Sequence, residues 1–232
     1  LSKECSCDPR FTDNLLTNAV KTNPTLEHIR QTIDSSRIIV STTASLATHT
    51  AIFSIKHFEL AIIDEASQIL EPNIVGLLAA HNEGEQVIDK FILIGDHKQL
   101  PAVVQQDNNE SAADSSLLEE IHLPNCANSL FERLILTERA AGRTDFVGTL
   151  RKQGRMHPDI AAFPNTYFYE REQLECVPLA HQTEPNLPYN EPSEDKTDDF
   201  LKEHRMVFIP SKSCRQPYIS EKVNTEEARI VA

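Results

Sequence analysis

Runs of consecutive apolar residues that end in small or acidic polar residues recur through the first half of the chain. Three runs, at residues 37–43, 58–67 and 90–101, have the length and composition of strands buried on both faces. Between the second and third, a stretch that starts at Pro72 has apolar residues at helical spacing. Buried strands that alternate with helices are typical of a parallel sheet covered on both sides. The pattern therefore predicts an α/β fold with a parallel sheet.

Later in the chain the pattern indicates a second domain. Ser129 and Glu132 have the spacing of a capping box at the start of a helix. The polar stretch "ERAAGRT" that follows this helix is a candidate hinge. We therefore place one domain at residues 1–143 and another at residues 144–232.

Within the second domain the pattern predicts short elements around a polar segment. A helix opens at Pro158, a strand covers residues 205–210, and Asn224 caps a further helix. Residues 181–203 mix Pro, Asn, Glu, Asp and Lys without a period. We expect an exposed insertion there, because such a composition buries little apolar surface.

Composition and charge narrow the classes of function. The chain has 232 residues, 40% of them hydrophobic, which is enough to bury a sizeable core. It has neither an apolar run of membrane-spanning length nor the pattern of a secretory signal, so we expect no membrane partner. Five cysteines without a C-x-x-C pair indicate a reducing, cytoplasmic setting. The net charge of −13 argues against nucleic-acid binding through the whole surface, but it allows a local basic groove.

Two of the apolar runs end in groups that suit phosphate chemistry. In "AIIDEASQ" the strand delivers Asp64 and Glu65 to its carboxyl edge, where one carboxylate can hold a divalent cation and the other can position or deprotonate water. In "LIGDHKQLP" the next strand delivers Asp96 and then Gln99, whose amide can bond a γ-phosphate oxygen and the attacking water. Either piece alone would be read as solvated residues in a turn. Two neighbouring strands that are both followed by acidic residues predict a nucleotide site.

A third stretch, "LRKQGRMHP", lies beyond the proposed hinge. An arginine supplied by a second lobe can neutralise the charge that develops on a transferred phosphoryl group, and Arg155 is the candidate for that role. Arg151 is the alternative. Either side chain could instead be a surface residue whose stem packs over nearby aromatic rings.

With these three stretches, the chain resembles superfamily 1 helicases of the up-frameshift-like branch, which also includes Dna-two-like helicase–nucleases. "IIDEASQ" resembles helicase motif II, "LIGDHKQLPAVV" motif III, and "SLFERLIL…LRKQGRMHPDIAAFPNTYFY" the segment leading through motif IV. The resemblance is specific, because three linked motifs occur in the family's order. It implies a P-loop NTPase fold with two RecA-like lobes, both incomplete here: the end of the first at residues 1–143 and the start of the second at residues 144–232.

The resemblance also implies roles for the residues at matching positions, with Mg²⁺ and ATP as cofactors. Asp64 would bind Mg²⁺ through water, and Glu65 would activate the hydrolytic water. Gln99 would sense the γ-phosphate, and Arg155 would reach it from the second lobe. The implied activity is that of an ATP-dependent helicase.

Four further positions belong to the implied binding surfaces. Asp96 and Gln153 would contribute to the ATP site. Thr42 and Thr43 lie in "STTAS", which occupies the place of a family segment that contacts the nucleic-acid backbone. The implied partner is single-stranded DNA or RNA, bound across the tops of the lobes.

The chain departs from the family in two places. It contains no G-x-x-x-x-G-K-[ST], the loop whose backbone amides and lysine cradle the phosphates. Gly154 stands where many relatives have an aromatic residue that stacks on adenine. We therefore expect this chain alone to bind nucleotide weakly and not to hydrolyse ATP efficiently.

Two other functions remain open. The missing phosphate loop, the acidic charge and Gly154 also fit a non-catalytic scaffold that keeps the helicase fold and binds protein or nucleic acid. A metal-dependent hydrolase could act on a non-nucleotide substrate through Asp64, Glu65 and Asp96 without a phosphate loop. That reading leaves Gln99 unexplained.

Overall fold

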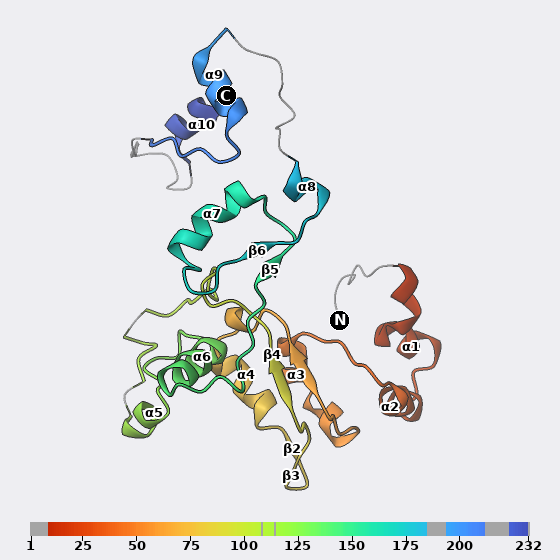
Figure 1. Cartoon of the computed structure of the whole chain (residues 1–232). Helices are drawn as coiled ribbons and strands as arrows, with labels where there is room; N and C mark the ends of the chain where they lie inside the picture. Colours follow the sequence, from red (N-terminus) through yellow and green to blue (C-terminus); the bar gives the residue numbers. More distant parts are fainter. Residues whose placement is uncertain (1–8, 108, 114, 185–193, 212–222, 232) are drawn as a thin grey trace. The chain divides into compact units, whose positions relative to one another are not determined.

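The computed structural model describes residues 9–107, 109–113, 115–184, 194–211 and 223–231. The chain divides into two compact units, Leu1–Val147 and Gly148–Ala232. Both units combine helices with short strands (Figure 1). In each unit one pair of strands is parallel, β1 with β4 and β5 with β6. The predicted α/β class is therefore confirmed, with sheets of two strands each in the described part of the chain.

The first unit contains most of the described elements. They are η1 (Pro9–Asn14), α1 (Leu16–Thr22), α2 (Leu26–Ser35), α3 (Thr43–Thr48), η2 (Thr50–Ser54), β1 (Ala61–Ile63), η3 (Ala66–Gln68), α4 (Glu71–Leu78), β2 (His81–Asn82), β3 (Glu85–Gln86), β4 (Phe91–Leu93), α5 (Ser116–Glu120) and α6 (Leu130–Ala140), where η denotes a 3-10 helix. The Ser129 hydroxyl accepts the Glu132 N–H at 3.2 Å and so caps α6. The predicted start of this helix is confirmed.

The central sheet of the first unit pairs β1 with β4 in parallel, with Ile62 opposite Ile92. Backbone bonds extend this pairing beyond the strands, because the Ile94 N–H donates to the Ile63 carbonyl at 2.8 Å and the Ala66 N–H donates to the Ile94 carbonyl at 2.7 Å. A core of buried side chains joins this sheet to α4 and α6: Phe53, Ile63, Ala66, Ile74, Leu77, Val87, Ile88, Leu130 and Phe131. The last residues of both strands, Ile63 and Leu93, therefore pack into or against this core.

The strand predicted at residues 37–43 is not formed. Residues 36–42 have no regular structure, and Thr43 already begins α3. Ile38 is 83% exposed and Val40 is 92% exposed. An apolar run forms a buried strand only where neighbouring strands and helices cover it, and the described residues supply none at this place. The runs at 58–67 and 90–101 do contain strands, β1 and β4, each three residues long.

The second unit is built from short elements. They are β5 (Lys152–Gln153), α7 (Pro158–Tyr167), β6 (Glu175–Cys176), α8 (Ala180–Thr183), α9 (Lys196–Glu203) and α10 (Thr225–Val231). The helix predicted to open at Pro158 is confirmed. The Asn224 side chain accepts the N–H groups of Glu226 and Glu227 at 3.2 and 3.3 Å, so its predicted capping role is confirmed as well.

The strand predicted at residues 205–210 is wrong. This segment is irregular, and Phe208 is 87% exposed, because no described strand lies beside it to pair with its backbone. Residues 181–203, the predicted insertion, include the end of α8 and all of α9, and residues 185–193 lie outside the described part. No helix among the described residues is long and apolar enough to cross a bilayer.

Candidate active site

The carboxyl ends of β1 and β4 bring the acidic residues of the first unit to one sheet edge. Asp64 and Glu65 directly follow the last paired residues of β1, and Asp96 follows β4 after two residues. Because the two strands are parallel, their ends lie side by side. The Asp96 N–H donates to the Ser67 hydroxyl at 3.1 Å, which joins the two loops directly.

Asp64 and Glu65 are both exposed at this edge. The Asp64 carboxylate accepts the Glu65 N–H at 3.0 Å. Glu65 has φ 51° and ψ 36°, in the left-handed region. For a residue with a Cβ this conformation costs roughly 1–2 kcal/mol, and such strain concentrates at functional sites. The reversal it produces turns the chain directly from β1 into η3.

Asp96 organises the loop after β4. One carboxylate oxygen accepts the Lys98 N–H at 3.0 Å, and the other accepts the Gln99 side-chain amide at 3.0 Å. Asp96 is half-buried, and Gln99 is exposed. The structure thus places Gln99 beside Asp96 at the same edge as the acidic pair. Its amide is held by a carboxylate and faces solvent.

Ser67 is a residue of this site that motif reasoning did not single out. It is only 6% exposed, and its hydroxyl accepts the Asp96 N–H. A buried hydroxyl with a backbone partner keeps its position, because losing that partner would leave a buried polar group without a hydrogen bond. The only signal in the sequence is its place two residues after Glu65 in "DEAS".

His97 belongs to the loop after β4 and lies against α6. Its ring centroid is 6.4 Å from that of Phe131. Burial lowers the pKa of His97 below its ordinary value of 6.5, and the nearby positive charge of Arg139 lowers that pKa further. The imidazole is therefore biased toward its neutral form in the folded protein.

In the second unit the two candidate arginines have different surroundings. Arg151 pairs with Glu175, with 3.4 Å between nitrogen and oxygen, and both side chains are about half exposed. Arg155 is exposed, and among the described residues no side chain pairs with its guanidinium. Arg155 is thus the one of the two whose charge is available to a ligand.

Gln153 is engaged within its own loop. Its side-chain oxygen accepts the N–H groups of Arg155 and Met156 at 2.9 and 2.7 Å, and its Nε2 donates to the Met156 carbonyl at 2.8 Å. These bonds shape the turn that carries Arg155. The predicted contact of Gln153 with nucleotide stays a prediction.

Thr42 and Thr43 lie at the start of α3. The Thr42 hydroxyl accepts the Ser45 N–H at 3.1 Å and so caps the helix, while Thr43 is its first residue. A helix start exposes backbone N–H groups that suit a phosphate oxygen. The predicted nucleic-acid contact of these residues is chemically compatible with this position, and it stays a prediction.

The residues at the sheet edge fit a water-rich magnesium site. Mg²⁺ prefers oxygen ligands, keeps several waters and is commonly held by one or two carboxylates. Asp64 offers such a carboxylate at an exposed strand end. Within the described ranges no three His, Cys, Asp or Glu residues cluster as metal ligands. The geometry therefore gives no support to a metal centre built from Asp64, Glu65 and Asp96 together.

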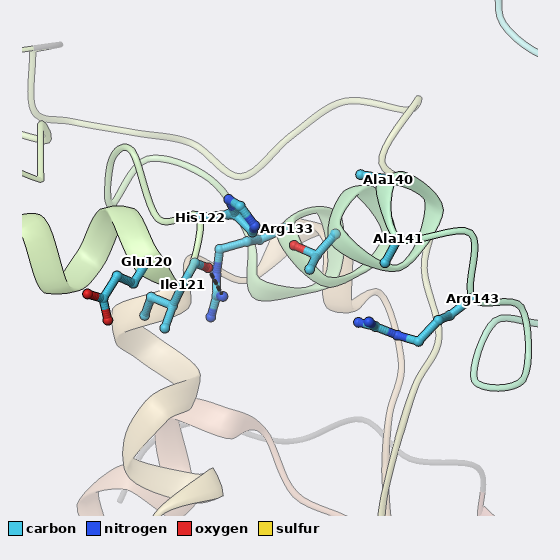
Figure 2. Close-up of a pocket in the computed structure, with 8 residues that line it drawn as sticks. Glu120, Ile121, His122, Arg133, Ala140, Ala141 and Arg143 are labelled. Carbon is cyan, nitrogen blue, oxygen red and sulfur yellow. Dashed lines mark hydrogen bonds between the residues drawn. The ribbon is translucent and has the colours of Figure 1, made fainter.

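A separate pocket of about 530 Å³ lies between the end of α5 and α6. Figure 2 shows Arg133 reaching across it to the Ile121 carbonyl, a bond of 2.6 Å. The same arginine binds Glu71, and Arg143, also in the lining, binds Glu138. The pocket contains none of the predicted site residues, and both of its arginines already have carboxylate partners.

Comparison with known proteins places the chain in a family. Two family profiles, both described as AAA domain, match residues 14–107 and 126–232. "DNA replication ATP-dependent helicase/nuclease DNA2" of Gallus gallus is 36% identical over 152 residues, which are 64% of this chain and 13% of that protein. "DNA polymerase alpha-associated DNA helicase A" of Saccharomyces cerevisiae is 32% identical over 61% of this chain and 19% of its own length. "Probable helicase MAGATAMA 3" of Arabidopsis thaliana is 35% identical, over 64% of this chain and 15% of its own length.

These matches define both the fold and the extent of the likeness. AAA domains have the P-loop NTPase fold, so that part of the predicted fold class is confirmed. The chain spans less than a fifth of the length of the three relatives named above. Both matched regions, the order of the motifs and the relatives agree: the chain belongs to the superfamily 1 helicases, in the branch of up-frameshift-like and DNA2-like proteins.

Proposed function

We propose that this chain is the central part of a longer ATP-dependent helicase or translocase, which couples Mg-ATP hydrolysis to movement on single-stranded nucleic acid. The observation that carries the proposal is the sheet edge at which Asp64 and Glu65 lie beside the loop of Asp96 and Gln99. The names of the three relatives support the same reading, because all of them specify a helicase and the first specifies an ATP-dependent one.

The two adjacent carboxylates divide the work of hydrolysis. Asp64 would hold Mg²⁺ through water, and the cation would neutralise negative charge on the phosphates. Glu65 accepts a proton from the attacking water, a role that its exposed position suits. Gln99, held by Asp96, orients that water and contacts the γ-phosphate.

The remaining charge is supplied by the second unit. Residues 1–143 and 144–232 form parts of two RecA-like lobes, and ATP binds between them. Arg155 reaches the γ-phosphate from the second lobe as an arginine finger. Its guanidinium has no partner among the described residues, which supports this role over Arg151. Gln153 shapes the loop of Arg155 at the edge of the ATP site.

Single-stranded DNA or RNA is the nucleic acid along which we propose that the protein moves. Thr42 and Thr43 contact its backbone at the start of α3, where N–H groups favour phosphate. DNA is the first substrate to test, because the printed names of two of the relatives given above specify DNA. Because the chain has a negative net charge, it binds nucleic acid through a local surface rather than through its whole surface.

Phosphate release by the longer protein with Mg-ATP tests the proposal. It is measured without nucleic acid, with single-stranded DNA and with single-stranded RNA, and Glu65→Gln serves as the matched control. Turnover that rises with one nucleic acid and is lost in Glu65→Gln supports the motor. Folded protein without turnover under any of these conditions favours the scaffold, a reading suggested by the missing phosphate loop and by Gly154.

A further inference from the structure

The loop that carries Arg155 is organised around one carbonyl group. The Met156 carbonyl accepts hydrogen bonds from three side chains: Gln153 Nε2 at 2.8 Å, Gln182 Nε2 at 2.8 Å and Cys176 Sγ at 3.3 Å. Three donors on one backbone oxygen form a network that holds the end of the turn in place. Only Gln182 comes from α8.

Gln182 and its neighbour His181 hold the loop on both sides of Arg155. The amide nitrogen of Gln182 donates to the Gln153 carbonyl at 3.0 Å as well as to Met156. His181 Nε2 lies 3.0 Å from the Gly154 carbonyl oxygen, and since that oxygen can only accept, Nε2 carries the proton. One turn of helix therefore binds the carbonyls that flank Arg155.

The burial of Gln182 has a cost in folding stability. The side chain is 2% exposed, and its Oε1 finds no hydrogen-bond partner among the described residues. A buried acceptor without a partner destabilises the fold, so an apolar residue would suit the same space better for stability alone. The presence of a glutamine here is explained by the two carbonyl groups that its side-chain nitrogen binds.

We propose that Gln182, together with His181, positions Arg155 for phosphoryl transfer. Gln153 shapes the turn from within, while Gln182 and His181 anchor that turn to α8 and so fix the direction from which Arg155 leaves the backbone. The inference rests on the proposed role of Arg155 as the arginine finger. Gln182 and His181 act through Arg155 and touch no reacting atom.

Hydrogen–deuterium exchange of the 232-residue chain tests the anchor without any need for activity. Gln182→Met keeps the length of the side chain and removes both donors. We expect exchange of the Arg155 and Met156 amides to become about tenfold faster, because the turn opens locally, while the amides of α7 stay protected. Thr183→Val is the control, because that hydroxyl bonds only carbonyls of its own turn.

An exposed variant keeps the test independent of folding. His181 is exposed, so His181→Ala leaves the buried packing unchanged and still removes the bond to Gly154. We expect faster exchange of the Arg155 amide in this variant too. Unchanged exchange in both Gln182→Met and His181→Ala would overturn the inference while leaving the proposed function intact.

A double-mutant cycle in the longer protein tests the link to catalysis. We expect Gln182→Met to lower the stimulated kcat by up to about 100-fold through misplacement of Arg155, with KM for Mg-ATP unchanged. In an Arg155→Ala background the same substitution should have no further effect. Additive losses would show a general structural role and overturn the inference. Full turnover in Arg155→Ala would overturn both the role of Arg155 and the inference.

Discussion

Gly95 packs directly against Ser67, so closely that a Cβ on Gly95 would lie 2.8 Å from the Ser67 backbone nitrogen and 3.1 Å from its hydroxyl oxygen. The contact joins the loop after β4 to the loop after β1. The Asp96 N–H, next along the chain, donates to the same hydroxyl. A shift of one loop must therefore move the other, which links Glu65 to Gln99 through Ser67 and Gly95.

Gly95→Ala should destabilise the chain by about 1–3 kcal/mol, because the added methyl group meets backbone that cannot rotate away. The free energy of unfolding from urea denaturation measures this loss. Gly76→Ala is the matched control, since nothing lies within 4 Å of its Cβ position in α4. There the same methyl group should stabilise by roughly 0.5–1 kcal/mol. Equal stability of the two variants would contradict the close contact.

Arg133→Met should be among the most damaging changes to the first unit. Arg133 binds the Glu71 carboxylate through two nitrogens, and the two side chains are 15% and 7% exposed. Removing the arginine leaves a buried carboxylate without its partner, which costs roughly 3–5 kcal/mol. Thermal or urea unfolding measures the loss.

The matched double variant Glu71→Leu/Arg133→Met should recover much of that stability, because it leaves no unpaired charge. If the double variant is as unstable as the sum of the single changes, the two residues are not coupled as the structure indicates.

Folding stability should depend on the titration of His97. Burial lowers its pKa in the folded state below the ordinary 6.5, so the unfolded chain binds a proton more readily. The contribution of the neutral imidazole is then fully present above pH 6.5 and is lost as the pH falls through the folded pKa. The difference in free energy of unfolding between wild type and His97→Gln, measured from pH 5 to 8, should increase with pH. A difference that is flat across this range would refute the assignment.

The acid-tipped strands could be predicted from sequence because the relevant signal is local. An apolar run ending in Asp64 and Glu65 specifies a strand end, and parallel pairing follows from the alternation with helices. The run at 37–43 has the same local pattern but forms no strand, since a strand exists only with neighbours to pair with. The length and composition of the run do not indicate whether such neighbouring strands are present.

The contacts that fix the site's loops could not be predicted. Gln182 lies in a polar stretch that suggests an exposed insertion, yet it is 2% exposed and binds carbonyls near Arg155. Such contacts join residues nearly 30 positions apart through backbone oxygens, which every residue has. The residue type at a single position therefore does not predict these long-range contacts.

The chain alone should bind Mg-ATP weakly. The phosphates find no backbone nest and no phosphate-loop lysine in this sequence, and Asp64 and Glu65 repel a triphosphate that carries no cation. Isothermal titration of the 232-residue chain should give a dissociation constant above the micromolar range. Micromolar binding would show that the described residues hold nucleotide without that loop.

The measurement that tests the account most directly compares Asp64→Asn with Glu65→Gln in the longer protein, following both Mg-ATP binding and phosphate release. We predict that Glu65→Gln binds Mg-ATP as the wild type does while its turnover falls by about 100- to 10,000-fold, because only the proton acceptor is lost. Asp64→Asn should weaken the magnesium-dependent part of binding. Wild-type turnover in Glu65→Gln would contradict the central claim that the carboxylates after β1 divide metal binding from water activation.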